Sequence, residues 1–292
     1  MKPTKTTLTL REIARLEAGS NINLQPVIEK ELIHYDIIRA MSENGFLERL
    51  CFQGGTALRL CYGSERFSED LDFTGGILFD HANMHQLKQC IEDYLSAKYG
   101  VQVEVKSPQE KKTAGIKVSS WQVKVVTAPG RTDIPTQKIK IEVANVPSYT
   151  RELVQISENY QLVSTPPLII GVESMDEIMA DKLLAFPAAA LPIRYRDIWD
   201  LHWLAMNRAH PNLIFLDQKI KDYGVEDFQH KLNARILSLA SIINGVEFME
   251  QMSRFLTQET MDTSIAKEDY RMALIGSLTR LLSTACENTN TA

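Results

Sequence analysis

Residues 66–73 read Arg-Phe-Ser-Glu-Asp-Leu-Asp-Phe, and this stretch decides the fold that we expect. Asp70 and Asp72 are two residues apart, so both carboxylates leave the same face of an extended strand. Leu71 and Phe73 then point to the other face, into a core. Like charges side by side repel each other, and such a pair is rarely kept for stability alone. The pattern indicates a strand that binds a divalent cation, with two solvated acids at a strand end as the alternative.

A third carboxylate is expected, because two-metal catalysis holds its ions between several acids and the phosphates of a substrate. Residues 138–143 read Lys-Ile-Lys-Ile-Glu-Val, so the apolar residues make one strand face and Glu142 shares the other with two lysines. Mg²⁺ prefers carboxylate, phosphate and water oxygens. We therefore predict a site for Mg²⁺, or for Mn²⁺ in its place, formed by Asp70, Asp72 and Glu142.

A glycine turn precedes the paired acids. Residues 53–56 read Gln-Gly-Gly-Thr and lie between a predicted short strand and a predicted helix. At such a junction, free backbone N–H groups and the helix dipole favour phosphate. A plain tight turn is the alternative. Taken with the acids, the turn indicates that Gly54, Gly55 and Thr56 cradle the phosphates of a nucleotide.

Hydrophobic periodicity divides the chain into a mixed half and a helical half, which predicts an α+β protein with a mixed sheet flanked by helices. A break at Pro166-Pro167 separates the halves, so we place the domains at residues 1–167 and 168–292. The predicted elements are helices at residues 27–50, 56–62, 81–99 and 174–187, and strands at residues 50–52, 71–74, 101–106, 117–126 and 138–146.

The composition is that of a soluble globular protein. The chain has 292 residues, of which 44% are hydrophobic and 24% charged, and it is long enough for two domains. Residues 1–10 lack the apolar core of a signal peptide, and no stretch is long and apolar enough to span a membrane. The four cysteines form no C-x-x-C pair, which argues against a zinc knuckle. We expect a cytoplasmic protein with reduced thiols.

The net charge of −5 conceals a basic segment. From residue 98 to residue 140, nine Lys or Arg stand against three acids. This segment is a candidate for contact with nucleic-acid phosphates. Solvated strand faces and loops explain it equally well.

Two helices carry the polar residues of the C-terminal half. Residues 174–177 read Ser-Met-Asp-Glu, which is typical of a capping box, so one helix begins at Ser174. Lys182 lies in the middle of that helix, where a snorkelling lysine at the edge of an apolar stripe is the structural explanation. In the next helix Arg196 and Asp200 are four residues apart. They form either a surface ion pair or a group in which Asp200 orients Lys182 or Arg196 in a cleft.

Together these motifs resemble the AbiEii/AbiGii-type nucleotidyltransferase toxins of the DNA-polymerase-beta-like superfamily. In this family a G-G-T-x-L turn and an R-F-S-x-D-L-D-F strand form the first motif, which resembles residues 52–58 and 66–73. Residues 139–144 resemble the strand that bears the third carboxylate. Lys182 and residues 196–201 resemble the family's lysine and its R-D-x-x-D-L helix.

The resemblance implies a bilobed protein, with a nucleotidyltransferase fold and metal site in the N-terminal lobe and a helical C-terminal lobe that closes the nucleotide cleft. It covers roughly residues 29–204 and departs from the family's pattern before Arg196, so it assigns no role to Arg194. Family members are toxins of bacterial toxin–antitoxin and phage-defence pairs. Some transfer nucleotides from an NTP to the 3′ end of tRNA, which blocks aminoacylation and so stops translation. The implied partners are tRNA and a cognate antitoxin protein.

The same resemblance implies a role for each candidate residue. Asp70, Asp72 and Glu142 bind the metal, and Glu142 helps to activate an RNA 3′-hydroxyl that attacks the α-phosphate of the NTP. Lys182 and Asp200 complete the catalytic set, with Lys182 offsetting charge on the triphosphate. The residues assigned to the nucleotide are Gly54, Gly55, Thr56, Arg66, Ser68, Lys182 and Arg196. The alternatives are transfer to a small-molecule hydroxyl, such as that of an aminoglycoside, or to a protein hydroxyl, and an inactive nucleotide-binding module that engages a partner protein.

Overall fold

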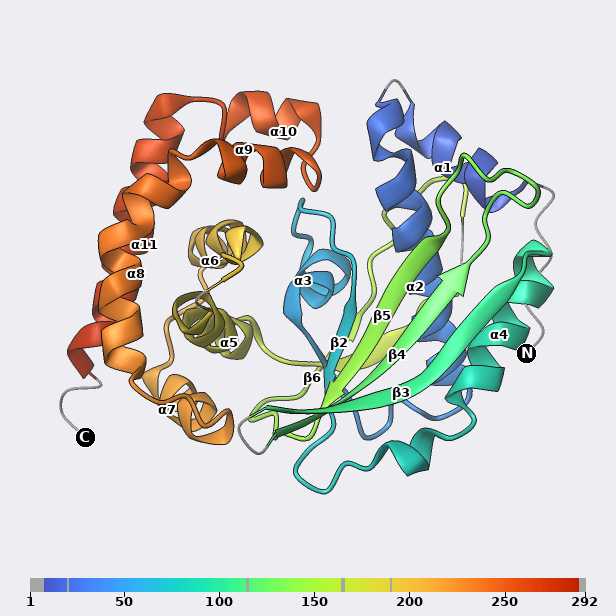
Figure 1. The fold of residues 1–292 in the computed structure, drawn as a ribbon, viewed down its shortest axis with the longest axis horizontal. Coiled ribbons are helices and arrows are strands. Elements are labelled where there is room, and N and C mark those ends of the chain that lie inside the picture. Colours follow the sequence, from blue (N-terminus) through green and yellow to red (C-terminus); the bar gives the residue numbers. More distant parts are fainter. Residues whose placement is uncertain (1–7, 20, 114–115, 164–165, 190, 289–292) are drawn as a thin grey trace. The chain divides into compact units, whose positions relative to one another are not determined.

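The computed structural model describes residues 8–19, 21–113, 116–163, 166–189 and 191–288. The chain forms two compact units. Unit 1 consists of Met1–Gly63 and Phe67–Val172, and unit 2 consists of Ser64–Arg66 and Glu173–Ala292. A mixed sheet occupies the first unit and helices make up the second, which confirms the α+β class (Figure 1).

A mixed sheet forms the centre of unit 1. Within the described residues it has seven strands in the order β3-β4-β5-β2-β1-β7-β6. The strands are β1 (Cys51–Gln53), β2 (Leu71–Thr74), β3 (Val103–Thr113), β4 (Ile116–Val125), β5 (Gln137–Ala144), β6 (Glu152–Gln155) and β7 (Ile169–Val172). The pairs β2–β5 and β1–β7 are parallel, and the other neighbouring pairs are antiparallel.

Helices cover one face of this sheet. They are α1 (Leu10–Ala18), α2 (Gln25–Glu43), α3 (Gly54–Tyr62) and α4 (Leu87–Tyr99), with short 3₁₀ helices at Ile22–Leu24 and His81–Met84. Helices α2 and α4 lie behind β3, β4 and β5 in Figure 1 and contact β5 and β3, respectively. Leu71 and Phe73 are buried as the alternation predicts, and the Phe73 ring packs against Phe52 with centroids 5.0 Å apart.

The observed elements differ from the predicted ones in several respects. Helix α1 was not predicted, the predicted helix 81–99 is divided into a 3₁₀ helix and α4, and β3 extends to Thr113. The predicted helix 27–50 ends at Glu43, and the turn structure that follows leads into β1. Strands β6 and β7 were not predicted, and β7 lies beyond the Pro166-Pro167 break, where the sequence indicated helices. Because β7 lies between β1 and β6 and is largely buried, its Ile-Ile-Gly-Val run lacks the period-two alternation of a half-buried strand.

Unit 2 is helical. Its helices are α5 (Met175–Ala188), α6 (Tyr195–Met206), α7 (Leu213–Asp222), α8 (Phe228–Ile243), α9 (Val246–Ser253), α10 (Gln258–Thr263) and α11 (Glu268–Asn288). Helix α5 begins as predicted, with the Ser174 hydroxyl accepting a hydrogen bond from the Glu177 N–H at 3.3 Å. In the part of the chain that the structure describes, no helix is both long and apolar enough to cross a membrane.

Candidate active site

The register between β2 and β5 brings two of the predicted acids together. These strands are parallel, and Asp72 is the direct partner of Glu142. Residues that pair directly point to the same face of a sheet, with Cβ atoms about 5 Å apart. Asp72 and Glu142 are both half-buried, whereas Leu71 and Ile141 on the other face are fully buried. Two carboxylates therefore lie side by side on the polar face.

The backbone of Asp70 is held by neighbouring helices. The buried Thr56 hydroxyl, on α3, donates a hydrogen bond to the Asp70 carbonyl. The buried His34 ring, on α2, contacts the Glu69 carbonyl through Nε2 at 3.0 Å, so that nitrogen carries the proton and donates. Burial lowers the pKa of His34 to about 3, which keeps the ring neutral. Thr56 therefore positions the acidic strand, and its hydroxyl is engaged inside the protein.

Gly54 lies directly against the Asp72 carboxylate. Its φ is +79°, and a Cβ at this position would stand 2.9 Å from Asp72 Oδ2. Helix α3 begins at this glycine, and its N-cap residue, Gln53, makes no side-chain cap hydrogen bond. The start of α3 therefore lies beside the acids, and its first backbone N–H groups have no partner within the helix. Phosphate binding by Gly54 and Gly55 stays a prediction. Ser68, also assigned to the nucleotide, is buried two residues before Asp70.

Three more of the predicted residues, Arg66, Lys182 and Asp200, take part in an ion cluster in unit 2. Arg66 donates two hydrogen bonds to Asp200, from Nε at 2.7 Å and from Nη2 at 2.8 Å. Lys182 Nζ lies 2.9 Å from Asp200 Oδ2 and 2.6 Å from Asp197 Oδ1. Asp197 also accepts a hydrogen bond from Arg194. Asp200 thus orients Lys182, one of the two roles left open by the sequence.

Charge compensation keeps this buried cluster ionised. Burial acts to raise the pKa of Asp200, but Arg66 and Lys182 outweigh it and hold that pKa well below its usual range. Burial likewise acts to lower the pKa of Lys182, but Asp197 and Asp200 outweigh it and raise that pKa. The cluster therefore carries fixed charges at neutral pH.

Sequence reasoning gave no role to Asp197, which lies inside the quoted R-D-x-x-D-L motif, or to Arg194, which lies just before it. Their spacing could have indicated the cluster, because Arg194 and Asp197 are three residues apart and Asp197 and Asp200 share a helical face. Arg196, which the sequence assigned to the nucleotide, lies with its guanidinium 4.9 Å from the centre of the Phe255 ring.

The chain matches one protein family over most of its length. The family model described as "Nucleotidyl transferase AbiEii toxin, Type IV TA system" matches residues 36–275. The chain belongs to the AbiEii family. No curated protein matches this AbiEii chain.

One solved structure supports the fold of this AbiEii protein. JHP933 from Helicobacter pylori superposes with a TM-score of 0.50 at 19% sequence identity, covering 91% of this chain and 95% of that one. A second Helicobacter pylori protein, described as a candidate nucleotidyltransferase, has a TM-score of 0.46 at 20% identity and covers 89% and 98% of the two chains. The family confirms the predicted nucleotidyl transferase toxin, with an NTP as substrate and an antitoxin as partner.

The acids of this AbiEii protein fit a metal that is shared with substrate. Among the described residues, no three His, Cys, Asp or Glu side chains are arranged to hold a metal ion by themselves. Glu142 instead lies 3.5 Å from Lys140 Nζ. Mg²⁺ is commonly bound by one or two carboxylates, with substrate phosphates and water completing its coordination. The oxygen donors of Asp70 and Asp72, on an open face beside Gly54, suit that kind of site.

A second ion cluster lies inside unit 2, and the sequence analysis did not find it. Lys219 is fully buried, with Nζ 3.2 Å from Glu173, 2.8 Å from Glu177 and 3.2 Å from Asp181. Burial raises the pKa of Glu173 well above its usual value and also raises that of Asp181. The three acids are spaced four residues apart, so a helical pattern puts them on one face, and this spacing could have indicated the cluster.

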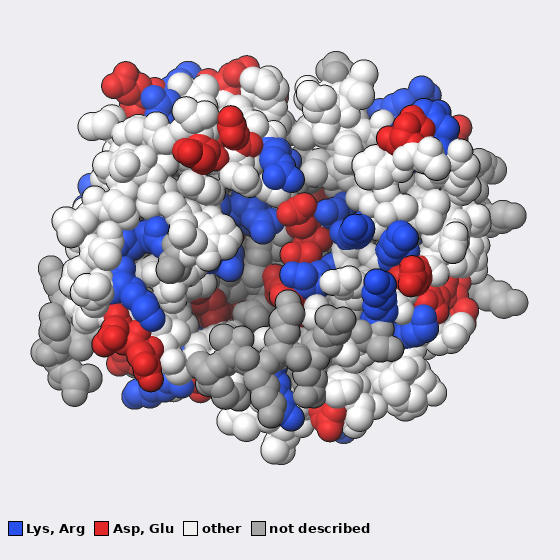
Figure 2. Space-filling view, in the orientation of Figure 1, with Lys and Arg blue, Asp and Glu red and all other residues white. Residues whose placement is uncertain are grey.

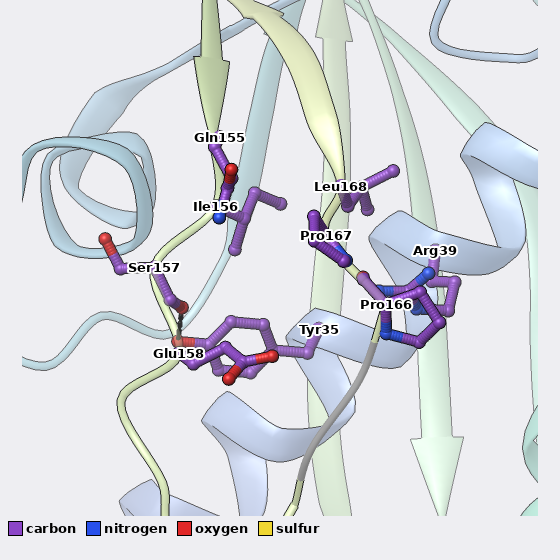
Figure 3. A pocket seen from close by; sticks show the side chains of 9 residues that line it. All are labelled: Tyr35, Arg39, Gln155, Ile156, Ser157, Glu158, Pro166, Pro167 and Leu168. Atoms are coloured by element: carbon purple, nitrogen blue, oxygen red, sulfur yellow. Dashed lines mark hydrogen bonds between the residues drawn. The ribbon is translucent and has the colours of Figure 1, made fainter.

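A small cavity in unit 1 has a structural role. It measures about 20 Å³, which is room for about one water molecule. Tyr35 and Arg39 approach it from α2, and the Pro166 and Pro167 rings lie opposite (Figure 3). Tyr35 donates a hydrogen bond to the Ser157 carbonyl at 2.8 Å, and Arg39 donates one to Pro166. These contacts fasten to α2 the chain just after β6 and the chain just before β7.

Proposed function

We propose that this protein uses Mg²⁺ to transfer a nucleotidyl group from an NTP to the 3′ end of tRNA. The observation that carries the proposal is the register of β2 and β5, which puts Asp72 beside Glu142 on a polar face, two residues from Asp70. When bound to Asp70 and Asp72, the ion supplies positive charge to the triphosphate and the leaving pyrophosphate. Transfer of a phosphoryl-type group requires little covalent chemistry from the protein and depends on positioning and on charge stabilisation. Acids that hold a metal ion beside the triphosphate meet both needs.

Glu142 is the residue that we assign to the acceptor hydroxyl. Its side chain is 28% exposed and lies next to Asp72, so a substrate can reach it. In the proposed step the Glu142 carboxylate accepts the proton of the 3′-hydroxyl while the 3′-oxygen bonds to the α-phosphorus. The bond from the α-phosphorus to the bridging oxygen breaks in line with the attack, and pyrophosphate leaves.

The phosphates of the NTP are assigned to backbone and cationic groups. The N–H groups of Gly54 and Gly55 at the start of α3 suit the β- and γ-phosphates, with Ser68 contributing its hydroxyl. Lys182 offsets the charge that develops on the triphosphate, and Asp200 holds Lys182 and Arg66 in position. Arg196 is assigned to the nucleotide as well.

The consequence of the reaction is a tRNA that cannot be aminoacylated. A nucleotide added to the 3′ end covers the hydroxyl that accepts the amino acid, so translation stops in the cytoplasm. Activity of this kind requires a neutralising antitoxin, and it suits a role in phage defence.

The experiment that tests this proposal identifies the acceptor. Purified protein is incubated with Mg²⁺ and each α-labelled NTP in turn, in the presence of total tRNA, an aminoglycoside mixture or a protein extract. We expect label on tRNA with one NTP or a subset of them, and none when EDTA replaces Mg²⁺. Label on the aminoglycosides or on protein would move the assignment to that acceptor, and no metal-dependent NTP binding by calorimetry would favour an inactive binding module.

A further inference from the structure

A groove of about 540 Å³ lies on the open face of unit 1, over β3, β4 and β5. Among its lining residues are four lysines and two acids, namely Lys106, Lys124, Lys138, Lys140, Asp70 and Glu104. Figure 2 shows Lys and Arg side chains gathered over these strands, with few acidic ones between them. The groove is therefore lined by an acid that the proposed function uses, Asp70, and lysines outnumber the acids of its lining by four to two.

The strand register explains how the lysines come to share one face. Lys124 of β4 pairs directly with Lys138 of β5, and Lys106 of β3 pairs with Gln122 of β4. Gln122 in turn pairs with Lys140. The row formed by Lys124 and Lys138 and the row formed by Lys106, Gln122 and Lys140 are two residues apart along the strands, which is roughly 6.6 Å. All of these side chains therefore point to the face that α2 and α4 leave open.

This arrangement does not serve the stability of the sheet. Directly paired like charges such as Lys124 and Lys138 destabilise a sheet. Among the described residues, Lys106, Lys124 and Lys138 form no ion pair, whereas Lys140 is paired with Glu142. Lys124 also pairs directly with Glu104 of β3, which offsets part of this charge. The positive charge that is left beside the acids is a feature that a bound polyanion would stabilise.

The groove suits the sugar-phosphate backbone of a nucleic-acid strand better than the bases of that strand. No aromatic side chain occurs among the described residues that line it, so bases have no ring on which to stack. Lysines bind phosphates as point charges and without reading sequence. The phosphates of the NTP are already assigned to the start of α3, which leaves this groove for the other substrate.

We propose that the groove binds the sugar-phosphate backbone of the acceptor's 3′ strand, through Lys106, Lys124 and Lys138, and leads its terminal hydroxyl toward Asp70. This inference rests on the proposed function, because it takes the acceptor to be a polynucleotide. It assigns acceptor binding to β3–β5 and predicts an affinity that depends on salt and little on base sequence.

The test is a binding measurement without NTP or metal, so its outcome is independent of catalysis. Fluorescein-labelled tRNA and short single-stranded oligo(A) and oligo(U) RNAs are titrated with the unaltered protein and with the triple variant Lys106→Gln/Lys124→Gln/Lys138→Gln. Lys140 is left intact because it contacts Glu142. Each single-strand phosphate contact contributes about 0.7 to the slope of log K against log salt, so the triple variant should lose about 2 from that slope.

Lys117→Gln is the matched control. Lys117 is exposed on β4, but it lies seven positions from Lys124, an odd offset, so it points to the opposite face. Lys111 and Lys112 also belong to the basic segment 98–140, but their side chains lie outside the described residues. We expect Lys124→Gln alone to weaken RNA binding several-fold and Lys117→Gln to leave it unchanged.

Two results would overturn the proposal. They are no RNA binding by the unaltered protein, and equal RNA binding by the unaltered protein and the triple variant. A protein that binds RNA through these lysines but transfers no nucleotide would leave the groove assignment standing and remove the proposed function.

Discussion

Gly54 is where a single side chain would disturb the candidate site most directly. In Gly54→Ala the new Cβ would stand 2.9 Å from Asp72 Oδ2, and the φ of +79° costs a non-glycine residue about 1–2 kcal/mol. We predict that Gly54→Ala lowers both the free energy of unfolding, measured in urea, and the rate of nucleotidyl transfer.

Gly63→Ala separates backbone strain from the contact with Asp72. Gly63 ends the same helix at φ +82°, and a Cβ there meets nothing within 4 Å. We expect Gly63→Ala to lose a similar free energy of unfolding and to keep its transfer rate. Equal transfer rates in the two variants would show that the close approach of Gly54 to Asp72 has no role.

His34 connects helix α2 to the strand that carries the acids, and it makes the stability of unit 1 depend on pH. Its pKa is lowered from 6.5 to about 3 by burial, so between these values the unfolded chain binds a proton that the folded chain does not. This contribution is fully present above pH 6.5 and is lost as the pH falls toward 3. We predict a loss of about 1.4 kcal/mol of unfolding free energy per pH unit in that window from His34 alone.

The variant His34→Gln isolates this contribution, because its amide can still donate to the Glu69 carbonyl. Urea unfolding at several pH values between 7 and 4 should show a shallower pH dependence for His34→Gln than for the unaltered protein. Identical slopes would mean that His34 is not buried as a neutral donor.

Elements with clear periodicity could be predicted from the sequence, and those set by long-range pairing could not. Strands β2, β4 and β5 alternate between apolar and polar residues over most of their length, and they occur within two residues of their predicted positions. Strand β7 is largely buried and lacks that alternation, so it was missed. The acids were found from their spacing, but the pairing of Asp72 with Glu142 depends on a parallel contact between distant strands. Likewise, 134 residues separate Arg66 from Asp200, and no local pattern joins them.

At the scale of the whole molecule, unit 2 depends on Lys219. This lysine is the counter-charge that contacts Glu173, Glu177 and Asp181, so Lys219→Met leaves these carboxyl groups without it. Removal of one partner from a buried ion cluster costs about 3–5 kcal/mol. We predict a loss of this size for Lys219→Met in urea unfolding.

Two variants serve as controls for the Lys219 cluster. Lys221→Met changes an exposed lysine on the same helix and should leave the free energy of unfolding nearly unchanged. Glu173→Gln should cost much less than Lys219→Met, because the raised pKa of Glu173 already favours its neutral form. A Lys219→Met protein as stable as the Lys221→Met protein would contradict the role of the cluster.

The central claim is that the polar face bearing Asp70, Asp72 and Glu142 is the transfer site. The most direct test compares Asp72→Asn with Asp133→Asn, which changes an exposed aspartate of the same unit, for Mg²⁺-dependent labelling of tRNA by α-labelled NTP. Substituting a residue that only supports a metal ligand lowers metal affinity or activity about 10–100-fold. Asp72→Asn should therefore lower the transfer rate by more than about a hundredfold, with an unchanged urea midpoint. Asp133→Asn should label tRNA like the unaltered protein. Full labelling by a folded Asp72→Asn protein would contradict the account.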